Sequence, residues 1–318
     1  MRHARSLART KKGRLVVFTT FDALLDAVKG MAPLPVAVVD AAEAYVLEAA
    51  CEAKRRHMID PILIGNQERI VSILASLPDC PTFDIVNVQS DEQAAEQGVD
   101  LVMNGQAQAV MKGHIHSDAF LHPILARLRT KERLSHVFMA ELPTYPKLLC
   151  VTDAAINITP SLMDKAQIVQ NAVDFLRELG VERPKVACLS AIEVINPQIP
   201  STIDAACLAK MAERGQIRHA LVDGPLAFDN AVSLKAAQIK GIQSVVAGDV
   251  DILLVPDLVS GNILVKDLEY LAQATLAGIV LGGRVPIILT SRADPPRARL
   301  VSAALAVLMH NRPQVTAS

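Results

Sequence analysis

The stretch "PVAVVDAAEAYVLEAACEAKRRHMIDPILIG", residues 35–65, decides the fold class of this chain. It begins and ends with short runs rich in Val, Ile and Leu, at 35–40 and 60–65, and the segment between them has the pattern of a helix. Both runs are apolar throughout rather than alternating, as expected for strands buried on both faces of a parallel sheet. The order strand, helix, strand predicts a βαβ unit.

The same alternation continues along most of the chain. Six further apolar runs are each followed within a few residues by a helix start: "FDIVNV" (83–88), "QAVMKG" (108–113), "KVACLS" (185–190), "RHALVDG" (218–224), "VDILLVPD" (250–257) and "VPIILTS" (285–291). Strands that alternate with helices in this way predict a mostly parallel α/β sheet.

One pair of strands interrupts this order. "HVFMAELPTY" (136–145) and "KLLCVTDAA" (147–155) follow each other too closely for a crossover helix, so we expect them to be antiparallel. We place a domain boundary at this break, near residue 139. Beyond it, Ser161 and Asp164 have the spacing of a capping box, which predicts a helix start.

Composition narrows the classes of function. The 318 residues carry 32 Lys and Arg against 33 Asp and Glu, so no overall field attracts nucleic acid or an anionic membrane. The absence of Trp, with three Tyr and seven Phe, leaves few platforms for base stacking. No uncharged apolar run reaches the roughly 18 residues of a membrane span, so we expect a soluble protein with small-molecule partners.

The cysteines stand singly within apolar segments and form no CxxC pair, which favours reduced thiols in a cytoplasmic protein over a disulfide framework. They are Cys51, Cys80, Cys150, Cys188 and Cys207. Residues 1–14 hold six Lys and Arg and no acid, and no apolar segment follows that would make them a secretory signal. We interpret them as a flexible basic arm.

Polar residues gather where the predicted strands end, in "KGHIHSD" (112–118), "DGPLAFDN" (223–230), "PDLVSGN" (256–262) and "TSRAD" (290–294). Ligands of open parallel sheets bind at the carboxyl ends of the strands, where the following helices direct their positive N-termini. Lys, Ser, Asn and Arg side chains in these clusters are donors suited to phosphate oxygens. The four clusters together predict a site for a polyanion.

Each cluster also has a structural interpretation. Asp118, Asp229 and Asp294 stand at junctions where N-caps are favoured, and capping is the commoner role of such residues. The sequence contains no GxGxxG, GxxxxGK[ST] or GxSxG, which argues against dinucleotide binding, nucleoside triphosphate hydrolysis and serine-hydrolase chemistry.

A metal site is a third interpretation. His114 and His116 form an HxH pair after a strand, as in the first element of amidohydrolase barrels. Such a site also needs histidines at the ends of later strands. Only His219 lies near a later strand, and it lies at the start of that strand, so the ligand count argues against a metal.

Four motifs together resemble the phosphate acetyltransferase and phosphate butyryltransferase family. They are "MKGHIHSDAFLHPIL", "DGPLAFDNA", "VDILLVPDLVSGNI" and "LTSRAD", and they occur in the order of that family. The resemblance implies transfer of a short acyl group between coenzyme A and inorganic phosphate, without a metal or a redox cofactor. Coenzyme A and acyl-CoA would be substrates, and the usual assembly would be a homodimer.

The resemblance also implies a fold like that of isocitrate and isopropylmalate dehydrogenases, with two three-layer α/β domains that flank a cleft. The last segment of that fold returns to the first domain. We therefore expect a discontinuous domain 1 at residues 1–138 and 287–318, and domain 2 at residues 139–286.

The family places a serine and an arginine at the end of its final strand, and the matching residues here are Ser291 and Arg292. Ser291 is expected to donate to the carbonyl oxyanion or to the leaving sulfur, and Arg292 to clamp phosphate. Further substrate-binding residues are expected from the other motifs: Lys112, His116, Ser117, Asp223, Ser260, Asn262 and Arg133. Arg129, Lys131 and Arg133 form a basic group that either meets the phosphates of coenzyme A or is a solvated helix end.

One departure from the family concerns the base. Acetyltransferases of the family carry an aspartate seven residues after the serine, and this chain has Ala298 there. Asp294 is the substitute carboxylate, although it is also the expected cap of the last helix. Because of this departure, the motifs do not decide whether the enzyme transfers an acetyl or a butyryl group.

Two rival functions follow from the same residues. One is an NAD(P)-dependent decarboxylating dehydrogenase of the same fold, and the other is an anion-binding homologue without catalysis. The apolar segment "ILVKDLEYLAQATLAGIVL" (263–281) is expected to form one long helix, in the core or at a dimer contact.

Overall fold

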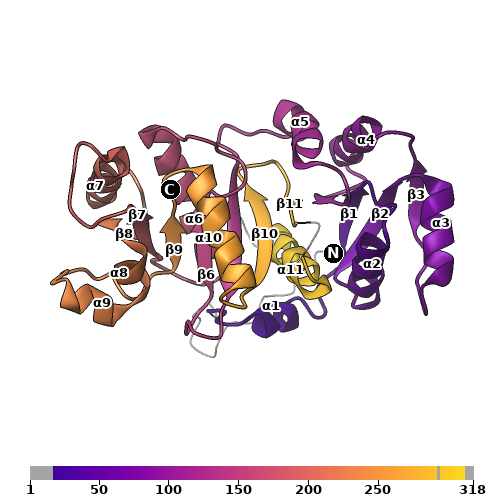
Figure 1. The fold of residues 1–318 in the computed structure, drawn as a ribbon. Coiled ribbons are helices and arrows are strands. Elements are labelled where there is room, and N and C mark those ends of the chain that lie inside the picture. Colours follow the sequence, from indigo (N-terminus) through magenta and orange to yellow (C-terminus); the bar gives the residue numbers. More distant parts are fainter. Residues whose placement is uncertain (1–16, 292–293, 312–318) are drawn as a thin grey trace, which may run out of the picture. The chain divides into compact units, whose positions relative to one another are not determined.

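The computed structural model describes residues 17–291 and 294–311, which form a mixed α/β fold (Figure 1). The chain divides into two compact units. Among the described residues, the split unit holds 21–134 and 277–311, and the central unit holds 135–276 with the short segment before Phe21. The basic arm expected at 1–14 and the side chain of Arg292 lie outside the described residues.

The sheet of the split unit is parallel except at one edge. Its strand order is β3 (Asp84–Asn87), β2 (Ile59–Gly65), β1 (Leu34–Val39), β4 (Ala109–Lys112), β11 (Ile287–Ile288) and β10 (Thr275–Leu281). Only β10 and β11 pair in antiparallel fashion among these neighbours. The predicted βαβ unit is confirmed, because β1 and β2 pair in parallel along their length.

Helices cover both faces of this sheet, as Figure 1 shows for α2 (Ala44–Arg55) and α4 (Asp91–Met103). α2 and α3 (Gln67–Ser76) follow β1 and β2 on one face. The chain then reverses direction across the sheet, so right-handed crossovers place α4 on the opposite face, where it packs on α5 (Ser117–Arg127). α11 (Pro296–Asn311) packs against α2 and α1 (Phe21–Ala27).

The central unit contains a second run of strands, in the order β5 (Ser135–Glu141), β6 (Leu149–Thr152), β9 (Ile252–Leu254), β7 (Lys185–Leu189) and β8 (Leu221–Leu226). The predicted antiparallel pair is confirmed, since β5 runs against β6 with Phe138 opposite Val151. The remaining neighbours in this unit are parallel.

The helices of the central unit are α6 (Leu162–Glu178), α7 (Pro200–Glu213), α8 (Phe228–Val232), α9 (Leu234–Ile239) and α10 (Leu258–Tyr270). The capping box of Ser161 and Asp164 is confirmed at the start of α6. α6 packs on α7, whereas residues of α8, α9 and α10 share one core with alternate strand residues such as Val151 and Leu253. Because neighbouring strand residues point to opposite faces, these strands are apolar throughout.

The expected long helix at residues 263–281 is wrong. α10 ends at Tyr270, and Thr275 begins β10, so the segment is divided between a helix and a strand. Gln273 in the connection has a left-handed backbone with φ of 57°. Short apolar runs do not distinguish a buried strand from a helix, and here the run at 275–281 is a strand whose residues are almost all buried.

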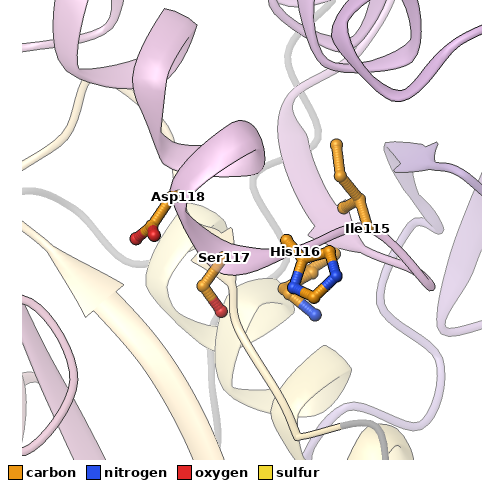
Figure 2. A pocket seen from close by; sticks show the side chains of 5 residues that line it. Ile115, His116, Ser117 and Asp118 are labelled. Atoms are coloured by element: carbon orange, nitrogen blue, oxygen red, sulfur yellow. The ribbon is translucent and has the colours of Figure 1, made fainter.

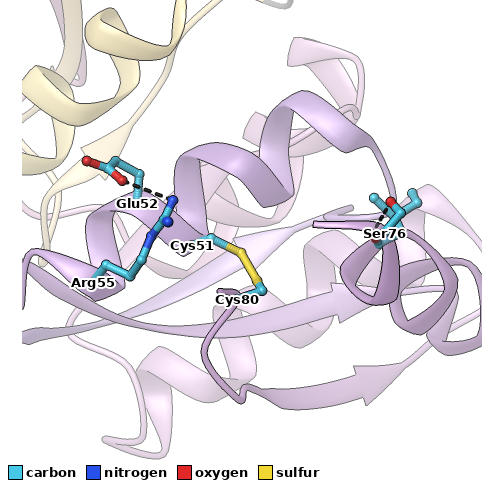
Figure 3. The surroundings of a disulfide bond; sticks show 6 residues. Cys51, Glu52, Arg55, Ser76 and Cys80 are labelled. Carbon is cyan, nitrogen blue, oxygen red and sulfur yellow. Dashed lines mark hydrogen bonds and ion pairs between the residues drawn. A yellow bond between two sulfur atoms is a disulfide. The ribbon is translucent and has the colours of Figure 1, made fainter. Parts of the chain in front are cut away.

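The expectation that every cysteine is a reduced thiol is also wrong. Cys51 of α2 and Cys80, in the segment after α3, form a disulfide with Cα atoms 5.7 Å apart (Figure 3). Cys150, Cys188 and Cys207 are free. The pair meets because α2 and α3 pack side by side on the same face of the sheet.

No helix in the described part of the chain is long and apolar enough to cross a membrane.

Candidate active site

The loop that follows β4 is held against the end of β1. The amide of Gly113 donates to the carbonyl oxygen of Val39 at 2.8 Å, and the amide of His114 donates to that of Asp40 at 2.9 Å. A Cβ atom at residue 113 would lie 2.1 Å from the Asp40 carbonyl oxygen, so only glycine permits this approach. The loop therefore leaves the sheet in one defined direction.

A pocket of about 240 Å³ lies where this loop enters α5. Its lining residues are Lys112, Ile115, His116, Ser117 and Asp118. Figure 2 shows the side chains of His116, Ser117 and Asp118 at the loop and the first turn of α5. Lys112 is only 4% exposed. A buried lysine beside the amides of a helix N-terminus is an arrangement that binds anions.

Asp118 does not have the capping role expected for it. His116 occupies the N-cap position of α5, no side chain caps the helix there, and Asp118 lies within the first turn. The amides of that turn therefore remain available to an anion in the pocket. Asp229 likewise lies inside α8, whose N-cap residue is Ala227.

The two histidines of the HxH pair have different surroundings. Nδ1 of His114 lies 3.0 Å from the Tyr45 hydroxyl, whereas His116 lines the pocket. Among the described residues, no three His, Cys, Asp or Glu side chains gather into a group that could hold a metal ion.

Asp40 directly follows β1, next to this loop, and has a left-handed backbone with φ of 54°. Burial raises the pKa of its carboxyl group, and the charge of Asp91 adds to the rise, while His114 opposes it. The sequence pattern did not single out Asp40.

The second predicted loop follows β11. Ile288 of β11 pairs in parallel with Met111 of β4, and Ser291 and Asp294 come after β11. Hydrogen bonds join these two residues, and we call the pair the Ser291 turn. The Ser291 amide donates to Oδ2 of Asp294 at 2.7 Å, and the Asp294 amide donates back to the Ser291 carbonyl at 3.3 Å. Asp294 is buried and Ser291 is half-buried. These bonds hold Ser291 in a defined position after β11, the strand next to the one that ends in Lys112.

Arg299 of α11 holds the same turn from its other side. Its Nη1 donates to the Asp294 carbonyl at 2.6 Å and its Nη2 to the Ser291 carbonyl at 2.9 Å. Burial lowers the pKa of this guanidinium, and the charge of Asp294 opposes the shift. Sequence reasoning missed Arg299, although a charged residue within the apolar face of the last helix was a signal for it.

The predicted residues of the central unit lie on two different elements. Asp223 was expected at the end of its strand, but β8 continues to Leu226, so Asp223 lies inside it, half-buried, and accepts from the Gly224 amide. Strand β7 separates β8 from β9, the strand that precedes α10. Ser260 and Asn262 lie in the first turns of α10.

The side chains on α10 already have partners within the unit. Asp257 caps α10 by accepting from the Ser260 amide at 2.8 Å, and the Ser260 hydroxyl lies 3.1 Å from the same carboxylate. Nδ2 of Asn262 lies 3.5 Å from the Ala154 carbonyl. Arg133 is half-buried just before β5, in the split unit.

Comparisons with known proteins bear on these strand-end loops. Residues 82–307 match the family described as phosphate acetyl/butaryl transferase. This chain belongs to that family. A phosphate acetyltransferase of Rickettsia felis is 48% identical over 287 residues, which span 89% of this chain and 82% of that protein. A phosphate butyryltransferase of Clostridium acetobutylicum is 42% identical over 294 residues, spanning 91% and 98%.

A crystal structure agrees with the family assignment. The branched-chain phosphotransacylase from Enterococcus faecalis V583 superposes with a TM-score of 0.75 at 31% identity, covering 87% of this chain and 98% of that one. The protein is therefore an enzyme of the phosphate acetyl/butyryltransferase family. Neither the dehydrogenase nor the non-catalytic alternative is favoured.

The position of the missing family aspartate is a core position here. Ala298 has no exposed surface and lies in the first turn of α11. The buried carboxylate close to Ser291 is that of Asp294, which belongs to the turn itself.

Proposed function

We propose that this enzyme of the phosphate acetyl/butyryltransferase family converts acyl-CoA and inorganic phosphate into acyl phosphate and coenzyme A, and the reverse. The observation that carries the proposal is the pocket with its buried Lys112 at the N-terminus of α5, next to the strand that ends in the Ser291 turn. A phosphate ion fits this combination of charge and amide donors.

In the acyl-phosphate direction, a phosphate oxygen attacks the thioester carbonyl, and the carbon–sulfur bond breaks as the tetrahedral intermediate collapses. The sulfur leaves as a thiolate, or as a thiol if it takes up a proton. Lys112, His116 and Ser117 are proposed to bind and orient phosphate, which lowers the barrier by removing the entropy cost of the encounter. No metal or redox cofactor enters this step.

Ser291 and Arg292 are proposed to act on the developing charge. The Ser291 hydroxyl would donate to the carbonyl oxygen as it becomes an oxyanion, or to the leaving sulfur. The Arg292 guanidinium would hold phosphate oxygens in its two-pronged fork. Asp294 supports the role of Ser291, because its carboxylate fixes the Ser291 amide, and it is the proposed substitute for the aspartate that Ala298 replaces.

Asp223, Ser260 and Asn262 are proposed as further substrate-binding residues, and Arg133 is proposed to meet the phosphates of coenzyme A. These residues carry hydrogen-bonding groups or positive charge suited to the amide and phosphate groups of that substrate. The two-domain arrangement with a cleft, and the boundaries 1–138 with 287–318 and 139–286, stay predictions.

A homodimer and a cytoplasmic location complete the proposal. Apolar side chains of α10 and its end are exposed, as expected of a subunit contact: Val259, Ile263, Tyr270 and Leu271. Light scattering on the purified protein measures the mass in solution, and a monomeric mass would contradict the dimer. Thiol counting on protein taken directly from cells tests the location. Free thiols at Cys51 and Cys80 would support the cytoplasm, and an intact disulfide between them would contradict it, because disulfides are rare in a reducing compartment.

The decisive experiment is a steady-state panel of acetyl-, propionyl- and butyryl-CoA with phosphate, in which the released thiol is measured. We expect phosphate-dependent thiol release and an acyl phosphate product that traps as the hydroxamate. The relatives include both acetyl and butyryl enzymes, so the ratio of kcat/KM values across the panel assigns the chain length. No release with any of the three would contradict the proposal.

A further inference from the structure

Two loops that are far apart in the sequence are joined by side chains of two helices in the split unit. The loop at 112–118 and the turn at 291–294 carry the proposed phosphate-binding and catalytic groups. The two residues that connect these loops are Arg299 of α11 and Tyr45 of α2.

We propose that Arg299 and Tyr45 are positioning residues, which hold the Ser291–Asp294 turn and the His114 loop in one fixed relative geometry. The proposal rests on the function proposed above. It assigns neither residue a contact with substrate.

The first link runs from Arg299 to the turn. Its guanidinium donates to two backbone carbonyl oxygens of the turn, that of Ser291 at 2.9 Å and that of Asp294 at 2.6 Å. The planar guanidinium of arginine can hold two carbonyl oxygens at fixed relative positions, whereas the ammonium group of lysine, on its flexible side chain, cannot. Arg299 is 3% exposed, so these bonds form away from competing water.

The second link runs from Arg299 to Tyr45. The guanidinium carbon lies 4.5 Å from the centroid of the Tyr45 ring, a cation–π distance. The Tyr45 hydroxyl then lies 3.0 Å from Nδ1 of His114. His114 belongs to the loop that follows Lys112, so a displacement of Tyr45 would reach that loop through this contact.

The helix itself gives no reason for a cation at this place. Arg299 lies in the first turn of α11, where the positive end of the helix dipole disfavours a positive side chain. Its guanidinium instead contacts the turn before the helix and the ring of Tyr45. A buried charge that opposes the dipole is therefore better explained by what it holds than by helix stability.

Three substitutions test the link. Arg299→Lys keeps the charge but loses the fork, Tyr45→Phe keeps the ring but loses the bond to His114, and the double variant removes both. Arg297→Lys is the matched control, because Arg297 is an exposed arginine of the same turn that pairs with Asp22. Ser302→Ala is the stability control, because its buried hydroxyl on α11 donates to the Ala298 carbonyl and accepts from the Gly278 amide of β10.

We expect Arg299→Lys to lower kcat by about tenfold or more, with KM for acyl-CoA changed by less than about threefold. Tyr45→Phe should lower kcat by a smaller factor of about three to ten, and the double variant should lose less than the product of the single losses, because both act on one linkage. The two controls should retain kcat, even where Ser302→Ala lowers the melting temperature.

Hydrogen exchange provides a readout that does not depend on catalysis. Amides at 289–294 should exchange faster in Arg299→Lys, and amides at 113–116 should exchange faster in both Arg299→Lys and Tyr45→Phe. Unchanged exchange at 113–116 in both variants, or a kcat loss in Ser302→Ala equal to that in Arg299→Lys, would overturn the proposal. If the native protein forms no acyl phosphate, the proposed function fails, while the exchange data still decide whether the two residues position these loops.

Discussion

Ile288 of β11 pairs with Met111 of β4 across two parallel strands, so the chain enters the Ser291 turn from the strand next to the one that ends in Lys112. The two strands come from the two separate stretches of sequence that form the split unit, 21–134 and 277–311. Parallel pairing makes the carboxyl ends of these strands neighbours. The chemistry proposed for the site depends on this adjacency, because an anion at Lys112 must lie within reach of the groups that act on the carbonyl.

Lys112→Met should weaken the use of phosphate. Removal of the buried ammonium deletes a charged hydrogen bond, so we expect KM for phosphate to rise at least tenfold, equivalent to about 1.4 kcal/mol, with KM for acyl-CoA little changed. Initial rates at varied phosphate measure the effect. Lys29→Met, at an exposed lysine of the same unit, is the control. An unaltered phosphate KM would remove Lys112 from the site.

Arg292→Ala should slow turnover by at least about tenfold and weaken phosphate use, since a charged donor to the phosphate oxygens is lost. Arg297→Ala removes an arginine of the neighbouring helix turn that points to Asp22, and it should leave both constants unchanged. The comparison is made by steady-state kinetics at saturating acyl-CoA. Equal kinetics of the two variants would contradict the role of Arg292.

Asp40→Asn should stabilise the protein at neutral pH. Burial raises the pKa of Asp40 in the folded state above 3.8, so the folded state binds its proton more tightly than the unfolded state does. Stability from this group is therefore present below pH 3.8 and is lost as pH rises through the folded pKa. Asparagine cannot ionise and accepts the left-handed backbone of this position.

Urea unfolding at pH 7 and near pH 3.5 measures this difference. The gain in free energy of unfolding of Asp40→Asn over the native protein should be present at pH 7 and vanish at the lower pH. Asp79→Asn is matched, because Asp79 is exposed and has the same left-handed backbone. A variant that is less stable than the native protein at pH 7 would show that the Asp40 carboxylate stabilises the fold.

Reduction of the Cys51–Cys80 bond should lower stability without changing the site. The two cysteines are 29 residues apart, and closing a loop of that size in the unfolded chain is worth about 3 to 4 kcal/mol. We expect Cys51→Ser and dithiothreitol to lower the melting temperature by similar amounts, and Cys207→Ser to leave it unchanged. Identical melting curves with and without reductant would contradict this stabilisation.

Much of the architecture was predictable from local patterns. Runs such as "VAVV" are apolar on both faces, which only a strand covered by helices on both sides accommodates, and β1 shows that burial. The capping box of Ser161 and Asp164 was predictable because both of its bonds are made within four residues. The family motifs also predicted the loop that forms the pocket.

The sequence by itself determined the α/β class, the antiparallel pair β5 and β6, and the loops where polar groups gather, because each depends on residues close together in the chain. Only the tertiary structure decided that 275–281 is a strand, that Cys51 meets Cys80, and that Arg299 and Tyr45 join two loops. Those three features depend on which distant segments pack together. The local sequence around a short apolar run, a cysteine or a buried arginine does not indicate which distant segment it will contact.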